Sequence, residues 1–253
     1  MSNFSAAWLA LRAPADAAAR DAGLARRFAD ALPLRPKIID LGAGTGAHAR
    51  ALAPLVVGDW VLVDRDAALL ARGAEFATIL LDLAAGCDAL DALGADAVTA
   101  SAFFDLVSED WLVRFARWLA ARRLPLYATL TVDGRRIWSP ADPDDAPIAA
   151  AFRRHQRRDK GFGAALGPAA PDFLARLLAG HGFAIAAAAS DWRLGPAQRG
   201  LIEALVQGEA RAARAEGAAW ERRRLDQAAA GLLHLTIGHR DLLALPSQTC
   251  EKG

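Results

Sequence analysis

The chain has 253 residues, of which 54% are hydrophobic and 23% are charged. These fractions are typical of a globular protein and exclude a disordered chain. The 30 Lys and Arg residues nearly balance the 29 Asp and Glu residues, so the formal net charge is only +1. No overall field therefore favours nucleic acid or a membrane surface as a partner.

Two further features indicate where the protein works. Cys87 and Cys250 have neither metal-ligand spacing nor the pattern of a disulfide framework, which favours a reducing compartment. The apolar stretch 6–11 ends at Arg12 and is too short for a signal peptide or a membrane span. We therefore expect a soluble cytoplasmic protein without a bound metal, either a monomer or a homodimer.

The first elements along the chain are helical. Residues 5–13 and 15–32 have helical patterns, and Leu24, Phe28 and Leu32 lie four apart on one face. Prolines at 33 and 36 then end the helical pattern. We expect residues 1–33 to form a helical N-terminal lid.

Short apolar runs and helical stretches then alternate up to Gly134. The predicted strands cover residues 37–41, 60–63, 76–81, 95–100 and 126–132, and a strong helix is predicted over 109–123. This alternation is typical of βαβ units and a parallel sheet. Residues 34–134 therefore read as the half of a single domain that binds a cofactor.

The pattern becomes less regular after Gly134. Prolines and aspartates over 138–147 predict a loop. Helices are predicted over 147–160 and 171–179, and a helical region over about 197–230 that breaks near residue 217. Strands are predicted over 183–192 and 233–238. The count is seven strands. We expect 135–181 to form a cap insert and 182–245 to form the C-terminal half of the sheet.

A glycine-rich segment, Ile39-Asp-Leu-Gly-Ala-Gly-Thr-Gly46, stands between the first predicted strand and the next helix. Glycines allow a tight turn there and let a ligand lie against bare backbone. The free N–H groups of the helix that follows favour the same use. The spacing Gly42-x-Gly44-x-x-Ala47 also fits a dinucleotide fingerprint, so the loop alone leaves an NAD(P)-binding oxidoreductase open.

Acidic residues follow the next two predicted strands. Asp64 comes 18 residues after Gly46, where a carboxylate can accept hydrogen bonds from both ribose hydroxyls. Asp82 comes 18 residues later and, with Leu83, suits the amino group and the face of an adenine. Asp40, just before the first glycine, can meet a cationic amino group. Together these residues describe a nucleoside that carries an amino-acid tail, and they require no pyrophosphate.

With these motifs the chain resembles the class I S-adenosylmethionine-dependent methyltransferases, most strongly over residues 35–134. The whole sequence is also similar to an uncharacterised bacterial branch of that family that contains a His-Gln-x-x-Asp-Lys-Gly-Phe-Gly segment. The resemblance implies an α/β fold, with a Rossmann-like, doubly wound, mostly parallel sheet of seven strands whose last strand is antiparallel. It implies S-adenosylmethionine as cofactor, S-adenosylhomocysteine as product, and a cofactor site formed by Asp40, Gly42, Ala43, Gly44, Thr45, Gly46, Asp64, Arg65, Asp82, Leu83 and Ser101.

Candidates for catalysis lie in the cap insert. On a helix over 147–160, His155 and Asp159 share one inward-facing stripe, and Gln156 borders it. A carboxylate four residues away makes an imidazole a better base. We expect His155 to act as a general base or substrate anchor, with Asp159 as its partner. The alternative is a structural pair that holds the insert to the sheet.

The segment after the fourth strand is the second candidate. Asp105 either points into the cleft or caps the helix that begins near Ser108. The segment lacks the Asn/Asp-Pro-Pro-Tyr pattern expected of methyltransferases that act on DNA bases, which weakens a nucleic-acid substrate. Arginines at 135–136 and 153–158 either form solvated faces of the protein or attract an anionic acceptor. The expected substrate-binding residues are Phe103, Gln156, Lys160 and Trp138.

These observations lead us to expect transfer of a methyl group to an O, N or C atom of a small molecule. The first alternative is a regulatory or interaction protein of the same fold that binds S-adenosylmethionine or S-adenosylhomocysteine without catalysis. An NAD(P)-binding oxidoreductase is less favoured. A short-chain dehydrogenase would need Tyr-x-x-x-Lys, whereas Tyr127 is followed four residues later by Thr131.

Overall fold

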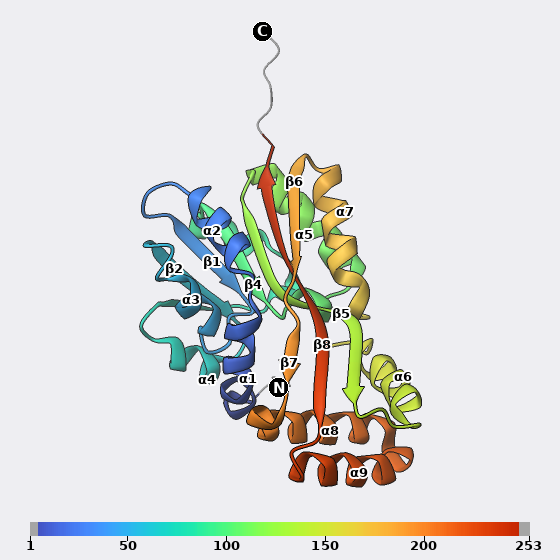
Figure 1. The fold of residues 1–253 in the computed structure, drawn as a ribbon. Helices are drawn as coiled ribbons and strands as arrows, with labels where there is room; N and C mark the ends of the chain where they lie inside the picture. Colours follow the sequence, from blue (N-terminus) through green and yellow to red (C-terminus); the bar gives the residue numbers. More distant parts are fainter. Residues whose placement is uncertain (1–4, 248–253) are drawn as a thin grey trace.

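The computed structural model describes residues 5–247 and contains one mixed sheet (Figure 1). The strand order is β3-β2-β1-β4-β5-β8-β6, and β7 also pairs with β8. The strands are β1 Lys37–Leu41, β2 Asp59–Asp64, β3 Ala77–Leu80, β4 Ala97–Ser101, β5 Leu126–Ser139, β6 Phe183–Ala189, β7 Trp192–Leu194 and β8 His234–Pro246. Strands β1 to β5 pair in parallel, and β8 runs antiparallel to both β5 and β6. The predicted α/β fold class is confirmed.

The sixth strand differs from its prediction in one detail. The chain leaves the sheet at Ser190 and Asp191, so the run predicted over 183–192 forms two strands, β6 and β7, which pair separately with β8. The backbone N–H of Ser190 still donates to the carbonyl of His239 at 3.0 Å. The interruption is therefore local, and β6 and β7 together take the place of the single strand that was predicted.

Helices cover both faces of the sheet (Figure 1). They are α1 Ala6–Ala19, α2 Ala22–Asp30, α3 Ala47–Leu52, α4 Ala67–Leu70, α5 Glu109–Arg122, α6 Asp145–Gln156, α7 Ala170–Gly180, α8 Arg199–Ala213 and α9 Gly217–Ala229. Ile39 of β1 packs into the same core cluster as α5 and α7, whereas its neighbour Ile38 packs with α2 and α3. Successive strand residues face opposite sides of the sheet. These apolar strands are consequently buried on both faces.

Two predicted helix boundaries are wrong at the N-terminal end. The break expected near Pro14 is absent, since α1 continues through Pro14 to Ala19. Pro14 and Ala10, whose carbonyl loses its helical donor there, are both exposed, so water can reach that carbonyl. The break falls instead at Asp21, whose side chain accepts the N–H of Leu24 at 2.7 Å and caps α2.

Strands β5 and β8 are much longer than predicted. The strand was predicted to end at Val132, but β5 continues past Gly134, which has φ +88° within the strand, and the register shifts between Val132 and Arg136. The glycine therefore marks a bulge rather than a turn. Figure 1 shows β5 and β8 running on together toward α6, α8 and α9, which pack around this end of the pair. Within residues 5–247 no helix is long and apolar enough to cross a membrane.

Candidate active site

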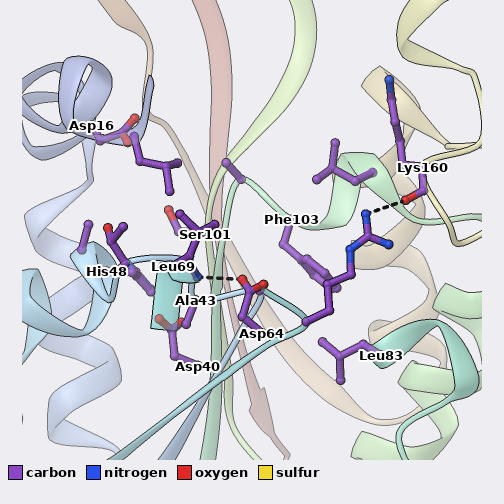
Figure 2. Close-up of a pocket in the computed structure, with 18 of the residues that line it drawn as sticks. Asp16, Asp40, Ala43, His48, Asp64, Leu69, Leu83, Ser101, Phe103 and Lys160 are labelled. Carbon is purple, nitrogen blue, oxygen red and sulfur yellow. Dashed lines mark hydrogen bonds between the residues drawn. The ribbon is translucent and has the colours of Figure 1, made fainter. Parts of the chain in front are cut away.

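A pocket opens where the carboxyl ends of the first strands meet helix α1 (Figure 2). The glycine loop, the ends of β2 and β4, and the segment after β3 form one side of it. Residues of α1 and the segment that holds Lys160 and Phe162 complete the lining. The cavity has a volume of about 160 Å³. In open α/β sheets, ligands bind in this position, beyond the carboxyl ends of the strands.

The glycine loop needs glycine both for its backbone shape and for its close contacts. Gly42, Gly44 and Gly46 have φ values of +60°, +55° and +79°. A Cβ atom on Gly42 would lie 2.6 Å from the ring of Phe103, and one on Gly46 would lie 2.8 Å from Leu62. A side chain at either position would therefore displace a packed neighbour as well as strain the backbone.

Asp64, at the end of β2, braces this loop. Its Oδ2 atom accepts the N–H of Gly44 at 2.8 Å, and its Oδ1 atom accepts the N–H of Asp66 at 2.9 Å. Figure 2 shows the first of these bonds within the pocket. The carboxylate thus fixes the loop and still faces the cavity.

Asp40 lies at the floor of the pocket and is fully buried. Its Oδ1 atom accepts the hydroxyl of Thr99 at 2.8 Å, while Oδ2 has no hydrogen-bond partner among residues 5–247. Burial raises the pKa of Asp40 to about 7, against the opposing effects of the Thr99 hydrogen bond and the charge of Arg20. The Oδ2 atom of this carboxylate can therefore accept a hydrogen bond from a cationic group of a ligand.

The structure brings together nearly all of the predicted cofactor residues. Gly46 is the exception, because it turns the backbone into α3 and packs near Leu62 instead of lining the cavity. The predicted cofactor residues that do line the pocket are Asp40, Gly42, Ala43, Gly44, Thr45, Asp64, Arg65, Asp82, Leu83 and Ser101. Their roles toward a ligand remain predictions.

Helix α1 contributes residues that the sequence analysis did not select. Arg12, Asp16 and Arg20 line the pocket together with Leu9, which lies in the segment expected to form a lid. Arg12, Asp16 and Arg20 are spaced four residues apart, as residues on one face of a helix are. This spacing could have indicated from the sequence that they share one face. His48 of α3 is a further residue that was not selected: it is only 3% exposed and lines the same pocket.

The predicted His155–Asp159 pair is also wrong. Helix α6 ends at Gln156, so Asp159 does not share a helical stripe with His155. Asp159 Oδ1 accepts the N–H groups of Gly161 at 2.6 Å and Gly163 at 2.9 Å. Aspartate side chains often bond nearby backbone N–H groups in this way, in competition with a helix.

His155 itself lies elsewhere. It is half-buried and does not line the pocket. Its pKa is lowered, first by burial and then by the charges of Lys160 and Arg158. Without a carboxylate partner, the reason for selecting it as a base is removed.

The segment after β4 contains Asp105, in a short 3-10 turn over Phe104–Leu106. It does not cap α5, because the Ser108 side chain accepts the N–H of Trp111 at 3.3 Å in that role. Oδ1 of Asp105 is buried and unpaired within the described part of the chain. Burial raises the pKa of Asp105 to about 6, and the charges of Arg12 and Lys160 oppose the rise.

The predicted substrate residues are divided between different parts of the molecule. Phe103 and Lys160 line the pocket. Gln156 lines a separate small cavity near Phe152 and Gly134. Trp138 is buried in the core around α8 and α9, with its ring 5.6 Å from that of Trp220. Only the first two are therefore placed to contact a ligand in the pocket.

The arginines at 135–136 are engaged within the protein. Arg135 donates to Asp191 at 2.7 Å and also pairs with Asp133. Arg136 pairs with Glu209, which is 1% exposed. Both guanidinium groups are thus committed to structural carboxylates.

Comparisons with known proteins support the fold. No protein-family model and no curated protein matches the chain. A candidate methyltransferase from Bacillus halodurans C-125 is 14% identical over 90% of this chain and 100% of its own, with a TM-score of 0.51. YcgJ from Bacillus subtilis (12% identity, 88% and 98% covered) has a TM-score of 0.49. The mycolic acid cyclopropane synthase CmaA1, complexed with S-adenosylhomocysteine, has a TM-score of 0.48, with 12% identity over 88% of this chain and 83% of its own.

The similarity to the Bacillus halodurans structure indicates a shared fold, and in this chain β8 runs antiparallel to β5 within an otherwise mostly parallel sheet. This chain therefore has the Rossmann-like fold of the class I S-adenosylmethionine-dependent methyltransferases.

Proposed function

We propose that this protein is a methyltransferase that uses S-adenosylmethionine to methylate a small molecule. The observation that carries the proposal is one pocket in which the glycine loop, Asp64 and Asp82 face the same cavity. These groups match, in order, an amino-acid tail, a ribose and an adenine. The match uses only residues at the ends of β1, β2 and β3.

The hydrogen-bonding capacity of Asp64 fits this role. A carboxylate offers about four lone-pair positions. Asp64 uses one on Gly44 and one on Asp66, which leaves capacity for both hydroxyls of a ribose. Asp82 is exposed and uses an oxygen on the N–H of Ala84 at 3.0 Å, so it also retains capacity for an adenine amino group.

When bound, S-adenosylmethionine supplies an activated methyl group on a sulfonium. The protein then has to exclude water, align the acceptor and, where the acceptor atom carries a proton, remove that proton. We propose Asp105 as the base. It does not itself line the cavity, but its buried, unpaired oxygen lies in the turn between Phe103 and Leu106, which both do. A pKa of about 6 leaves this carboxyl largely ionised at neutral pH.

The size of the cavity bears on how a ligand enters. At about 160 Å³ it is smaller than a typical ligand pocket of roughly 300–1,000 Å³. Leu9 of α1 lies over Gly44, 3.1 Å from the place of a Cβ atom, and Phe103 lies over Gly42. We propose that α1 and the segment 159–163 act as a lid, and that they move outward when cofactor and acceptor enter.

Thermal unfolding of the full chain tests the cofactor assignment. S-adenosylhomocysteine raises the melting temperature and NAD⁺ does not, because a ligand that binds only the folded state stabilises it. Incubation with S-adenosylmethionine and a fraction of cellular small molecules then yields S-adenosylhomocysteine. Stabilisation by NAD⁺ alone would contradict the proposal. Stabilisation by S-adenosylhomocysteine without turnover on any fraction would favour the non-catalytic alternative.

A further inference from the structure

Buried side chains with unused hydrogen-bonding atoms gather at one end of the pocket. Arg20 directly follows α1, Asp40 lies on β1, and His48 lies on α3. Arg20 Nε, Asp40 Oδ2 and both ring nitrogens of His48 are buried and have no partner within residues 5–247. All three residues line the same cavity. We call them the tail cluster. Because buried polar atoms are nearly always paired, their coincidence in one cavity indicates a ligand.

The acidic neighbours of Arg20 are already occupied. Asp16 accepts two bonds from Arg12, at 2.9 and 3.0 Å, and one from the indole N–H of Trp192 at 3.0 Å. Asp241 accepts the backbone N–H groups of Asp21 and Leu130, both at 2.9 Å. These carboxylates lower the electrostatic cost of a buried guanidinium without using its Nε–H. That donor remains available to an anion in the cavity.

His48 is a neutral donor and acceptor in this setting. Burial, together with the charge of Arg20, holds its pKa well below the ordinary value. Its ring lies 6.1 Å from that of Tyr127, which limits its orientation. A neutral imidazole carries one N–H, so it can join Arg20 at an anionic oxygen.

The tail cluster therefore presents donors at Arg20 and His48 and an acceptor at Asp40. The chemical group that satisfies both sets is a zwitterion with a carboxylate next to an ammonium. We propose that Arg20 and His48 bind the α-carboxylate of the ligand's amino-acid tail, and that this contact selects ligands with an intact carboxylate. The inference rests on the proposed function, since it assumes a nucleoside in the other half of the pocket.

The position of Arg20 gives this contact a second effect. Arg20 follows the last residue of α1, and its backbone N–H still bonds the carbonyl of Asp16 in that helix. A ligand carboxylate bound to Arg20 thus links α1 to the glycine loop and α3. Ligands without the carboxylate do not make this link and leave α1 less firmly held.

Calorimetric titration of the full chain with two ligands tests the proposal. S-adenosylhomocysteine carries the whole tail, and 5′-methylthioadenosine carries the same nucleoside without it. We expect the wild-type protein to bind the first at least about tenfold more tightly, as expected for charge-assisted hydrogen bonds. Arg20→Gln removes most of this difference and leaves the affinity for methylthioadenosine unchanged. Arg27→Gln, at an exposed position of α2, keeps the full difference.

Each result has a distinct meaning. Equal binding of the two ligands by the wild-type protein overturns the tail assignment and leaves the nucleoside site intact. A difference that Arg20→Gln does not reduce also overturns it. Binding of neither ligand contradicts the proposed function itself.

A third ligand tests the proposal without any variant, in case Arg20→Gln does not fold. The decarboxylated analogue of S-adenosylhomocysteine retains the amine and lacks only the carboxylate. We expect the wild-type protein to bind it more weakly than S-adenosylhomocysteine and more tightly than methylthioadenosine, because its amine still meets Asp40. Affinity equal to that of S-adenosylhomocysteine overturns the role given to Arg20 and His48.

Discussion

The Oδ2 atom of Asp64 accepts the backbone N–H of Gly44 at 2.8 Å, so the end of β2 holds the glycine loop that follows β1. The residue that we propose to bind the ribose therefore also positions the backbone that faces the ligand's tail. One substitution at this position affects both halves of the pocket.

Asp64→Asn weakens binding of S-adenosylhomocysteine by roughly tenfold or more, because hydrogen bonds to a charged group are lost. The new amide also cannot accept both the Gly44 and the Asp66 N–H groups with its two ends. Asp66→Asn is the matched control: its side chain caps α4, and asparagine caps as well as aspartate. Calorimetric titration compares them, and equal effects of the two variants would count against the role of Asp64.

Asp159→Ala loosens the turn that carries Phe162. The variant loses the bonds from Gly161 and Gly163, so the segment between Lys160 and Phe162 no longer holds its place in the pocket wall. We expect a several-fold weaker affinity for S-adenosylhomocysteine. His155→Ala serves as the comparison and leaves that affinity within about twofold, since His155 does not line the pocket. The reverse order of effects would contradict this placement of the two residues relative to the pocket.

Binding of S-adenosylhomocysteine depends on pH through Asp40. Burial raises the pKa of this carboxyl to about 7, and a bound ammonium lowers it again. Binding near pH 6 therefore releases a proton, and affinity falls as the pH drops below about 7, by at most roughly tenfold per pH unit. Titration in buffers of different ionisation enthalpy measures the released proton. Asp40→Asn abolishes the release; an unchanged release in that variant would place it on another group, such as Asp105.

Asp145→Ala destabilises the fold far from the pocket. Asp145 pairs with Arg224, whose side chain is fully buried, and accepts the indole N–H of Trp220 at 2.8 Å. Removal of one partner from a buried pair lowers the free energy of unfolding by about 3–5 kcal/mol. Glu203→Ala breaks the exposed Arg199–Glu203 pair and costs less than about 1 kcal/mol. Denaturant unfolding of both variants measures the difference, and similar losses would contradict the structural role of Arg224.

The sheet could be predicted from sequence because local and tertiary signals agree there. Strand β1 is a short apolar run that ends in glycines, and its bounds were predicted correctly. Asp64 ends β2 and Asp82 follows β3. These two strands pair in parallel, so both carboxylates lie at the same, carboxyl-terminal end of the sheet. Such regular spacing predicts a shared location without knowledge of the packing.

The residues that the sequence analysis missed depend on contacts between distant segments. His48 is buried on α3, and its ring lies 6.1 Å from that of Tyr127 in the distant strand β5, which no periodicity on a six-residue helix reveals. The end of α6 was misplaced because Asp159 bonds the N–H groups of two later glycines. Helical spacing alone cannot show that competition.

A crystal structure of the full chain with S-adenosylhomocysteine tests the central claim most directly. We expect the ribose hydroxyls to lie on Asp64, the adenine beside Asp82 and Leu83, and the amino-acid tail between Asp40 and Arg20. A nucleoside bound outside this pocket, or a dinucleotide whose pyrophosphate lies against residues 42–46, would contradict it.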